Sequence, residues 1–204
     1  MAELFSVNEA AAIAEISPDT IRTALEKKSV MPSHRYRAGK AVRHQFSVGD
    51  VLFMKLLAEF PFPLRKQDKA ALAEILVHGT KRAERWQEQG PDLVYRSGDM
   101  QVLVECKPIR QMVARNLTTF RWGKRRIVSS PEVLGGEPVF RGTRIPLQHI
   151  AALFRKGVPE PEIAEDFPSL NARDLAYARL FSLLGEKPGR PKKQLVLNRR
   201  RNAA

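Results

Sequence analysis

The start of the chain carries two helix-start signals separated by only a few residues. Ser6 and Glu9 have the spacing of a capping box, in which the two side chains satisfy backbone N–H groups that the first helical turn leaves free. Ser17 and Pro18 mark a second helix start, since serine caps well and proline fits the first helical position. With a first helix expected over 7–15, two short helices and a tight turn predict a helix-turn-helix unit. The second helix of such a unit enters the major groove of DNA.

A basic β-hairpin is expected next, over residues 30–43. Its tip, residues 37–40, contains the glycine that a tight turn favours. From Arg22 to Arg43 there are seven Lys or Arg residues and one acid, Glu26. Such a concentration of cations is typical of a recognition helix followed by a wing that contacts phosphates. The candidate DNA-binding residues are Ser17, Asp19, Thr20, Arg22, Thr23, Lys27, Arg35, Arg37, Lys40 and Arg43.

A third helix, capped at Ser47, is expected to run toward Phe60. Four stretches of this region then resemble the N-terminal DNA-binding domain of MerR-family regulators: Phe5-Ser6-Val7-Asn8-Glu9-Ala10-Ala11, Ser17-Pro18-Asp19-Thr20-Ile21-Arg22, Arg43-His44-Gln45-Phe46-Ser47 and Asp50-Val51-Leu52. The resemblance implies a winged helix in which Arg22 and residues around the wing face DNA phosphates. The chain departs from that family because no long coiled coil with an effector-binding cysteine set follows. A winged helix used only for protein contacts stays an alternative.

The net charge of +13 favours a polyanionic partner, because each phosphate that Lys or Arg neutralises releases condensed counterions. The excess of Lys and Arg over Asp and Glu is distributed unevenly along the chain. Lys and Arg outnumber Asp and Glu by 14 to 7 over residues 61–128 and by 7 to 1 over 186–204. Over 129–185 the ratio is 6 to 7, so this segment is not expected to be a strong phosphate binder.

Several protein classes are not expected. No run approaches the roughly 18 apolar residues of a membrane-spanning helix, and the first residues lack a secretory pattern. Cys106 is the only cysteine, which excludes an internal disulfide and a paired-cysteine metal site. We therefore expect a cytoplasmic protein with no metal ion or other cofactor and no membrane partner.

The middle region, residues 61–126, gives weaker signals. Residues 65–78 predict an amphipathic helix, with Ala70, Leu72, Ala73, Ile75, Leu76 and Val77 on its apolar face. Two strands are expected over 92–96 and 100–105. Basic and aromatic residues alternate over 107–128, a pattern found in nucleic-acid binding and also at the rims of packing surfaces. We expect the hairpin to serve dimerisation, which recognition of a two-fold DNA site requires.

An enzymatic alternative rests on the same hairpin. Asp92 follows a proline, and Glu105 and Lys107 lie further on, which fits the PD-(D/E)xK pattern of metal-dependent nucleases. In that chemistry two carboxylates hold Mg²⁺ and a lysine activates water. The pattern is of low specificity, because many hairpins carry three such residues, and the surrounding segment is short for that fold. We therefore expect no enzymatic activity and no catalytic residues.

Residues 127–185 predict an irregular arm followed by three short helices. Gly135, Gly136 and Gly142 permit turns in the arm, and Pro146 lies at a helix start. Apolar residues at helical spacing predict helices from 147 to about Gly157, over 160–166, and after a cap at Asn171. The run Ser130-Pro131-Glu132, Gly136-Glu137-Pro138-Val139, Arg141-Gly142-Thr143-Arg144-Ile145-Pro146, Gly157, Ile163, Phe167-Pro168 and Leu170 resembles the antitoxin-associated domain of unknown function numbered 433.

That resemblance implies a trihelical, helix-turn-helix-like domain in a protein paired with a PIN-like toxic ribonuclease. Members with a MerR-like N-terminus look like VapB-type antitoxins. Because PIN-type nucleases hold Mg²⁺ with clustered carboxylates, an arginine from the basic tail could occupy that site and displace the metal. A non-specific DNA-binding arm is the alternative for the tail. The candidate toxin-binding residues are Arg141, Arg144, Phe154, Leu195, Leu197, Arg199, Arg200 and Arg201.

The chain is therefore expected to be mainly α with small β elements, an α+β fold. Its expected parts are a winged helix-turn-helix over 1–60, a dimerising region over 61–126, a trihelical domain over 127–185 and a flexible basic tail over 186–204. The expected function is that of an antitoxin that neutralises a PIN-like ribonuclease and represses its own operator, as a homodimer or a hetero-oligomer with the toxin. A stand-alone MerR-like regulator without a toxin is the alternative, and the nuclease is a remote one.

Overall fold

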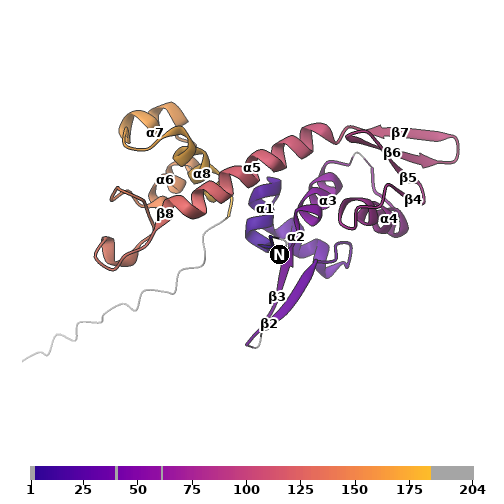
Figure 1. The fold of residues 1–204 in the computed structure, drawn as a ribbon, viewed down its shortest axis with the longest axis horizontal. Coiled ribbons are helices and arrows are strands. Elements are labelled where there is room, and N and C mark those ends of the chain that lie inside the picture. The colour runs from indigo at the N-terminus through magenta and orange to yellow at the C-terminus, as the bar shows by residue number, and fades with distance from the viewer. Residues whose placement is uncertain (1–2, 40, 61, 185–204) are drawn as a thin grey trace, which may run out of the picture.

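Eight α-helices and three small antiparallel sheets make up the part of the chain that the structure describes, residues 3–39, 41–60 and 62–184 (Figure 1). The structure is a computed structural model. The helices and sheets follow one another in a mixed order, which confirms the expected α+β class. The predicted tail, 186–204, lies outside the described residues, as does Lys40 of the hairpin tip.

The N-terminal part is a winged helix-turn-helix. Ser6 caps the first helix and Ser47 the third, each within a complete capping box, and Ser17 caps the second, as expected. The strands form one sheet in the order β1-β3-β2, in which Phe5 pairs with Phe46 and Ala38 with Ala41 across a turn that contains Gly39. The elements are β1 (Phe5–Ser6), α1 (Val7–Ala14), α2 (Pro18–Glu26), β2 (His34–Ala38), β3 (Ala41–Phe46) and α3 (Val48–Glu59).

The middle region contains more structure than the sequence indicated. The predicted helix and the two predicted strands are present as α4 (Lys66–Leu76), β6 (Asp92–Ser97) and β7 (Met100–Val104). Two further strands, β4 (Arg82–Ala83) and β5 (Trp86–Gln89), extend the hairpin into a four-stranded sheet in the order β4-β5-β6-β7. The expected apolar face of α4 is wrong at Ala70, which is exposed, because the helix turns Ala71 inward instead.

The basic and aromatic segment, for which no helix or strand was predicted, forms a 20-residue helix, α5 (Lys107–Arg126). Its buried side chains recur at helical spacing, but arginines and threonines lie between them and obscure the pattern. The inward residues are Ile109, Val113, Asn116, Leu117, Phe120 and Gly123. In Figure 1 this helix crosses from the four-stranded sheet to the C-terminal helices.

The C-terminal part has the predicted irregular arm and three helices. The arm contains β8 (Ile127–Val128), a 3₁₀ turn (Leu134–Gly136) and β9 (Val139–Phe140), and β8 pairs with β9. The helices are α6 (Leu147–Arg155), α7 (Glu160–Asp166) and α8 (Ala172–Ser182), with Asn171 capping α8 as expected.

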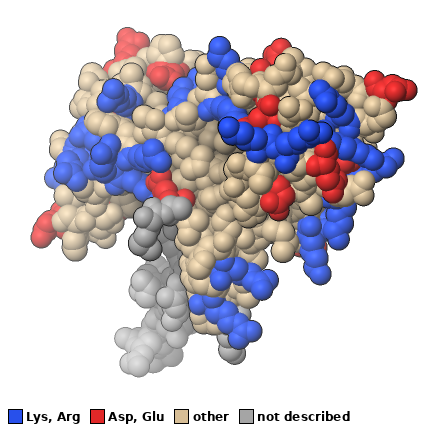
Figure 2. Space-filling model, turned by 45° about the vertical axis from the view of Figure 1, so that its right-hand side comes forward, with Lys and Arg blue, Asp and Glu red and all other residues tan. Residues whose placement is uncertain are grey.

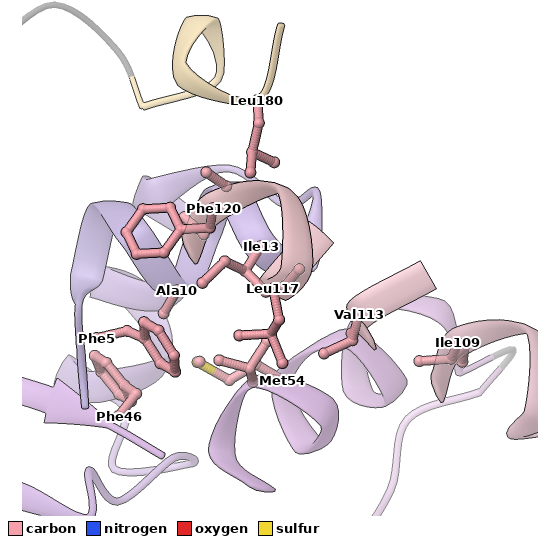
Figure 3. Packing of buried hydrophobic residues seen from close by; sticks show 14 of the residues in the cluster. Phe5, Ala10, Ile13, Phe46, Met54, Ile109, Val113, Leu117, Phe120 and Leu180 are labelled. Carbon is pink, nitrogen blue, oxygen red and sulfur yellow. The ribbon is translucent and has the colours of Figure 1, made fainter. Parts of the chain in front are cut away.

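Helix α5 joins the winged helix to the C-terminal helices through a shared apolar core. Figure 3 shows Leu117 beside Met54 of α3, and Leu180 of α8 above Phe120. The Phe120 ring also meets the Phe5 ring edge-on, with 5.9 Å between the ring centroids. Burial of this many large apolar side chains is the main favourable contribution to the folding free energy at such a junction.

A buried amide fixes α5 against the end of α1. The Asn116 side chain is 7% exposed, and its amide nitrogen donates to the Ile13 carbonyl at 3.0 Å and to the Glu15 carboxylate at 2.9 Å. The last carbonyls of a helix have no partner within that helix, so Asn116 satisfies one of these free acceptors. The bond sets the position of α5 along α1 more sharply than apolar contacts do, because hydrogen bonds are directional.

The other end of α5 is bound to α8 by a two-point ion pair. Arg126 donates to both carboxylate oxygens of Asp174, at 2.9 and 3.1 Å, and Asp174 is fully buried. The same carboxylate accepts from the backbone N–H of Asn171 at 3.3 Å and so completes the capping box of α8. The hydrogen bond to Asp174 raises the pKa of Arg126 above its ordinary value. The pair therefore stabilises the start of α8 and its contact with α5 together.

Gly123 permits the close approach of α5 and α8. A Cβ at this position would overlap the ring of Tyr177, which is 7% exposed. An alanine in an isolated helix is about 1 kcal/mol more favourable than glycine. Here the clash with a buried ring outweighs that preference, because overpacking a core costs about 1–3 kcal/mol.

We predict that Gly123→Ala lowers the free energy of unfolding by up to about 2 kcal/mol, the difference between the clash and the gain in helix propensity. Urea denaturation followed by circular dichroism measures it. In a Tyr177→Ala background the same substitution is expected to be neutral or stabilising, since the ring is gone. A similar destabilisation in both backgrounds would contradict the packing described here.

Candidate nucleic-acid interface

Helix α2 presents a polar face to solvent. Ile21 is its buried residue, packed into the core, and Ala24 and Leu25 are half-buried. The expected contact residues all lie on the opposite side or at the helix ends, and all are exposed: Ser17, Asp19, Thr20, Arg22, Thr23 and Lys27. Ser17 also caps the helix, because its hydroxyl accepts the Asp19 backbone N–H at 3.2 Å. The helix is therefore anchored along one face and free along the other.

Arg22 is held in place at the surface. Its guanidinium donates to the side-chain oxygen of Asn8 on α1, at 3.2 Å, and to the Asp19 carboxylate. Its side chain is still 52% exposed. Since a guanidinium has five N–H donors, bonds to Asn8 and Asp19 leave donors for a ligand. Asn8 is a functional candidate that the sequence analysis missed, because the bond joins residues 14 positions apart and has no local signal.

The wing carries cations on both of its faces. The register of β2 and β3 places Arg43 opposite Tyr36, so Arg35 and Arg37 lie on one face of the wing and Arg43 lies on the other. Arg35, Arg37 and Arg43 are all exposed. In Figure 2 the narrow projection at the lower edge of the molecule, where the β2–β3 hairpin points in Figure 1, shows Lys and Arg without neighbouring Asp or Glu.

A buried carboxylate fixes the base of the wing. Asp50 of α3 is 1% exposed and accepts from the backbone N–H and hydroxyl of Ser33, at 3.2 and 2.5 Å. It also accepts from the backbone N–H and hydroxyl of Ser47, at 2.7 and 3.0 Å. The residue that closes the capping box of α3 thus also ties down the strand that starts the wing. The sequence indicated the first of these roles and not the second.

A groove of about 1100 Å³ lies beside this surface, between the segment that follows α2, the start of α3 and the outer side of α4. Its floor is partly apolar and includes Phe53 and Val77. Its rim is basic, formed by Lys27, Lys28, His34, Lys66, Lys69 and His78. The basic surface of the winged helix therefore continues past α2 toward α4.

The three residues of the nuclease alternative, Asp92, Glu105 and Lys107, lie around the start of α5. The Asp92 carboxylate accepts the backbone N–H of Cys106 at 2.8 Å and that of Lys107 at 3.3 Å, at the N-terminus of α5. Glu105 and Lys107 are exposed. Burial is the largest cause of the raised pKa of Cys106, about 11. Asp92 therefore holds the start of α5 in place of a helix cap, a favourable position for a negative charge.

No three His, Cys, Asp or Glu side chains lie close enough together to hold a metal ion anywhere in residues 3–39, 41–60 and 62–184. None of the helices α1–α8 is both long enough and apolar enough to cross a membrane.

The candidate toxin-binding residues fall into two groups. Arg141 and Arg144 are exposed on the arm, and Arg141 donates to the Arg125 carbonyl at 3.1 Å. Phe154 is half-buried and packs against the core, so part of its ring is available to a partner. The remaining candidates lie outside the described residues: Leu195, Leu197, Arg199, Arg200 and Arg201.

Comparison with known proteins finds two similarities. Residues 127–181, from the arm to the last turn of α8, match the family described as "Protein of unknown function (DUF433)". The chain is also 30% identical over 87 residues to the uncharacterized protein y4eO of Sinorhizobium fredii (strain NBRC 101917 / NGR234). That alignment covers 43% of this chain and 39% of y4eO, so the chain spans about two fifths of that relative. The predicted resemblance of the C-terminal segment to family 433 is therefore confirmed over residues 127–181.

Proposed function

We propose that the protein is a DNA-binding antitoxin of the VapB type, with a MerR-like winged helix that binds operator DNA and a C-terminal part that binds and neutralises a PIN-like ribonuclease. The observation that carries the proposal is the exposed polar face of α2 next to a wing with cations on both faces. A helix with one buried side and one row of polar residues is the form that enters a major groove.

The proposed DNA contacts are of two kinds, contacts to base edges and contacts to phosphates. Thr20 and Thr23 on the outer face of α2 have short side chains suited to base edges. Arg22 and the wing arginines supply charge for phosphates, which position the protein without selecting sequence. Because Asn8 and Asp19 hold the Arg22 guanidinium, little side-chain entropy remains to be lost when it binds.

The toxin-binding part of the proposal rests on the match of residues 127–181 to family 433 and on the resemblance of that family to antitoxins. Arg141 and Arg144 give the arm two exposed cations for a carboxylate-rich partner. The basic tail supplies the arginines that would enter the ribonuclease site, in keeping with its charge ratio of 7 to 1 over 186–204.

Two other functions compete with this proposal. A stand-alone MerR-like regulator would use the same DNA surface without a toxin. A nuclease would need Asp92 as a metal ligand, but one oxygen of this carboxylate accepts two backbone hydrogen bonds at the start of α5. That arrangement favours a structural role for Asp92 and so favours a binding protein.

We predict that Arg22→Gln weakens binding to DNA from upstream of the protein's own gene by about tenfold, and that Arg35→Gln with Arg37→Gln weakens it further. Fluorescence anisotropy at several salt concentrations measures both. Loss of phosphate contacts should also reduce the slope of log affinity against log salt by about 0.9 per contact. Arg115→Gln on α5, with the same loss of charge at an exposed site, serves as the matched control. Equal effects of all three changes would contradict the assignment of the surface.

We predict that the full chain co-purifies with the product of its neighbouring gene and suppresses a ribonuclease activity of that product. A chain that ends at Glu186 should bind but suppress less, and Arg141→Glu with Arg144→Glu should weaken the complex, because a partner rich in carboxylates would repel the new charges. If no complex forms while operator binding is intact, the protein is a stand-alone regulator. Full suppression by the shortened chain would contradict the role of the tail.

A further inference from the structure

Strand β7 is an unprotected edge of the four-stranded sheet. The sheet order β4-β5-β6-β7 pairs β7 with β6 on one side and leaves its other side without a partner strand among the described residues. Its five residues, Met-Gln-Val-Leu-Val, include no charge, no proline and no glycine. Natural edge strands are normally protected against pairing by charged residues or proline, by a bulge or by a covering element.

The side chains of β7 are unusually apolar for a surface. Met100 is 47% exposed and Leu103 is 56% exposed, and the alternation of a strand places them on opposite faces. In Figure 1 the β6–β7 hairpin projects at the right, away from the winged helix and the C-terminal helices. The opposite edge of the sheet, β4, has only two residues and begins with Arg82. The features that permit pairing are therefore concentrated on β7.

We propose that two copies of the chain pair antiparallel through β7 and so join their sheets into one continuous sheet. Antiparallel pairing of identical strands has two-fold symmetry, the commonest symmetry of protein dimers. Chains with a net charge of +13 repel each other, so contact is favoured where cations are few. From Asp99 to Glu105 the chain has two acids and no Lys or Arg.

The charges at the ends of β7 select the register of the pairing. With Leu103 opposite the partner's Leu103, Val102 pairs with the partner's Val104 and Gln101 lies across from the partner's Glu105, so no acid faces an acid. With Val102 on the two-fold axis instead, Asp99 would face the partner's Glu105, and like charges directly opposite are destabilising. The charge pattern thus favours the two-fold axis at Leu103.

The dimer would carry two winged helices related by two-fold symmetry. If the proposed function is correct, this assembly is suited to an operator with two half-sites, so the inference deepens that proposal. Dimerisation itself is measured without DNA or a toxin. Its failure would leave a DNA-binding protein with another mode of assembly, and a failure of DNA binding would leave the dimer unaffected.

Multi-angle light scattering after size-exclusion chromatography of the full chain tests the pairing. We expect twice the mass of one chain for the wild type and the mass of one chain for Leu103→Lys, because a lysine on each copy brings two like charges onto the axis. Val42→Lys on β3, also an exposed strand position at 49%, is the matched control and should stay dimeric. Circular dichroism verifies that both variants are folded. A monomeric wild type, or a Leu103→Lys variant that remains dimeric, would overturn the proposal.

A cysteine scan tests the register. Leu103→Cys should form a disulfide-linked or bismaleimide-linked dimer, since residues on the axis face their own copies. Met100→Cys should not, because three residues from the axis the two copies of a position are about 20 Å apart along the strands. Cys106 is buried with a raised pKa, so the wild type is the background control. Efficient cross-linking through position 100 and not through 103 would refute this register.

Discussion

Helix α5 is the element on which the arrangement of the molecule depends. Its apolar face packs on α1 and α3 through Val113 and Leu117, and Phe120 continues this face toward α8 (Figure 3). Apolar packing alone would permit small sliding movements of one helix along another. Asn116 near its middle and Arg126 at its end remove that freedom, because each makes directional bonds to a different helix.

Buried polar side chains also join other pairs of helices and sheets by hydrogen bonds. Asp50 joins the base of the wing to α3, and Asp68 of α4 accepts a hydrogen bond from Tyr95 of the four-stranded sheet at 3.1 Å. With Asn116 and Asp174 these are the buried polar and charged residues of the described chain, and each joins two elements. A buried polar group is costly unless it is hydrogen-bonded, so an alternative packing that breaks one of these bonds is disfavoured. We infer that these four residues specify the relative positions of the helices and sheets, while apolar burial supplies most of the stability.

A structural feature could be predicted from the sequence when the residues that interact to form it lie close together along the chain. Capping boxes at Ser6 and Ser47 act over three residues, so the helix starts could be predicted directly. Helix α5 could not, because its apolar face is interrupted by arginines and its cap is Asp92, fourteen residues before Cys106. For the interface, the exposed residues of α2 and the wing were expected, but the bond between Asn8 and Arg22 joins two helices and has no local pattern. The contact of Asn116 with Ile13 spans 103 positions and is beyond any single-sequence argument.

The winged helix and the segment that matches family 433 therefore form one cooperative unit, because both pack on α5. Differential scanning calorimetry of the full chain tests this most directly. A shared helix predicts a single transition whose calorimetric enthalpy equals its van't Hoff enthalpy, because neither part can unfold without exposing the core around Phe120. Two separate transitions, with the second unaffected by Arg126→Gln, would show that the two parts fold independently and would contradict the central role of α5.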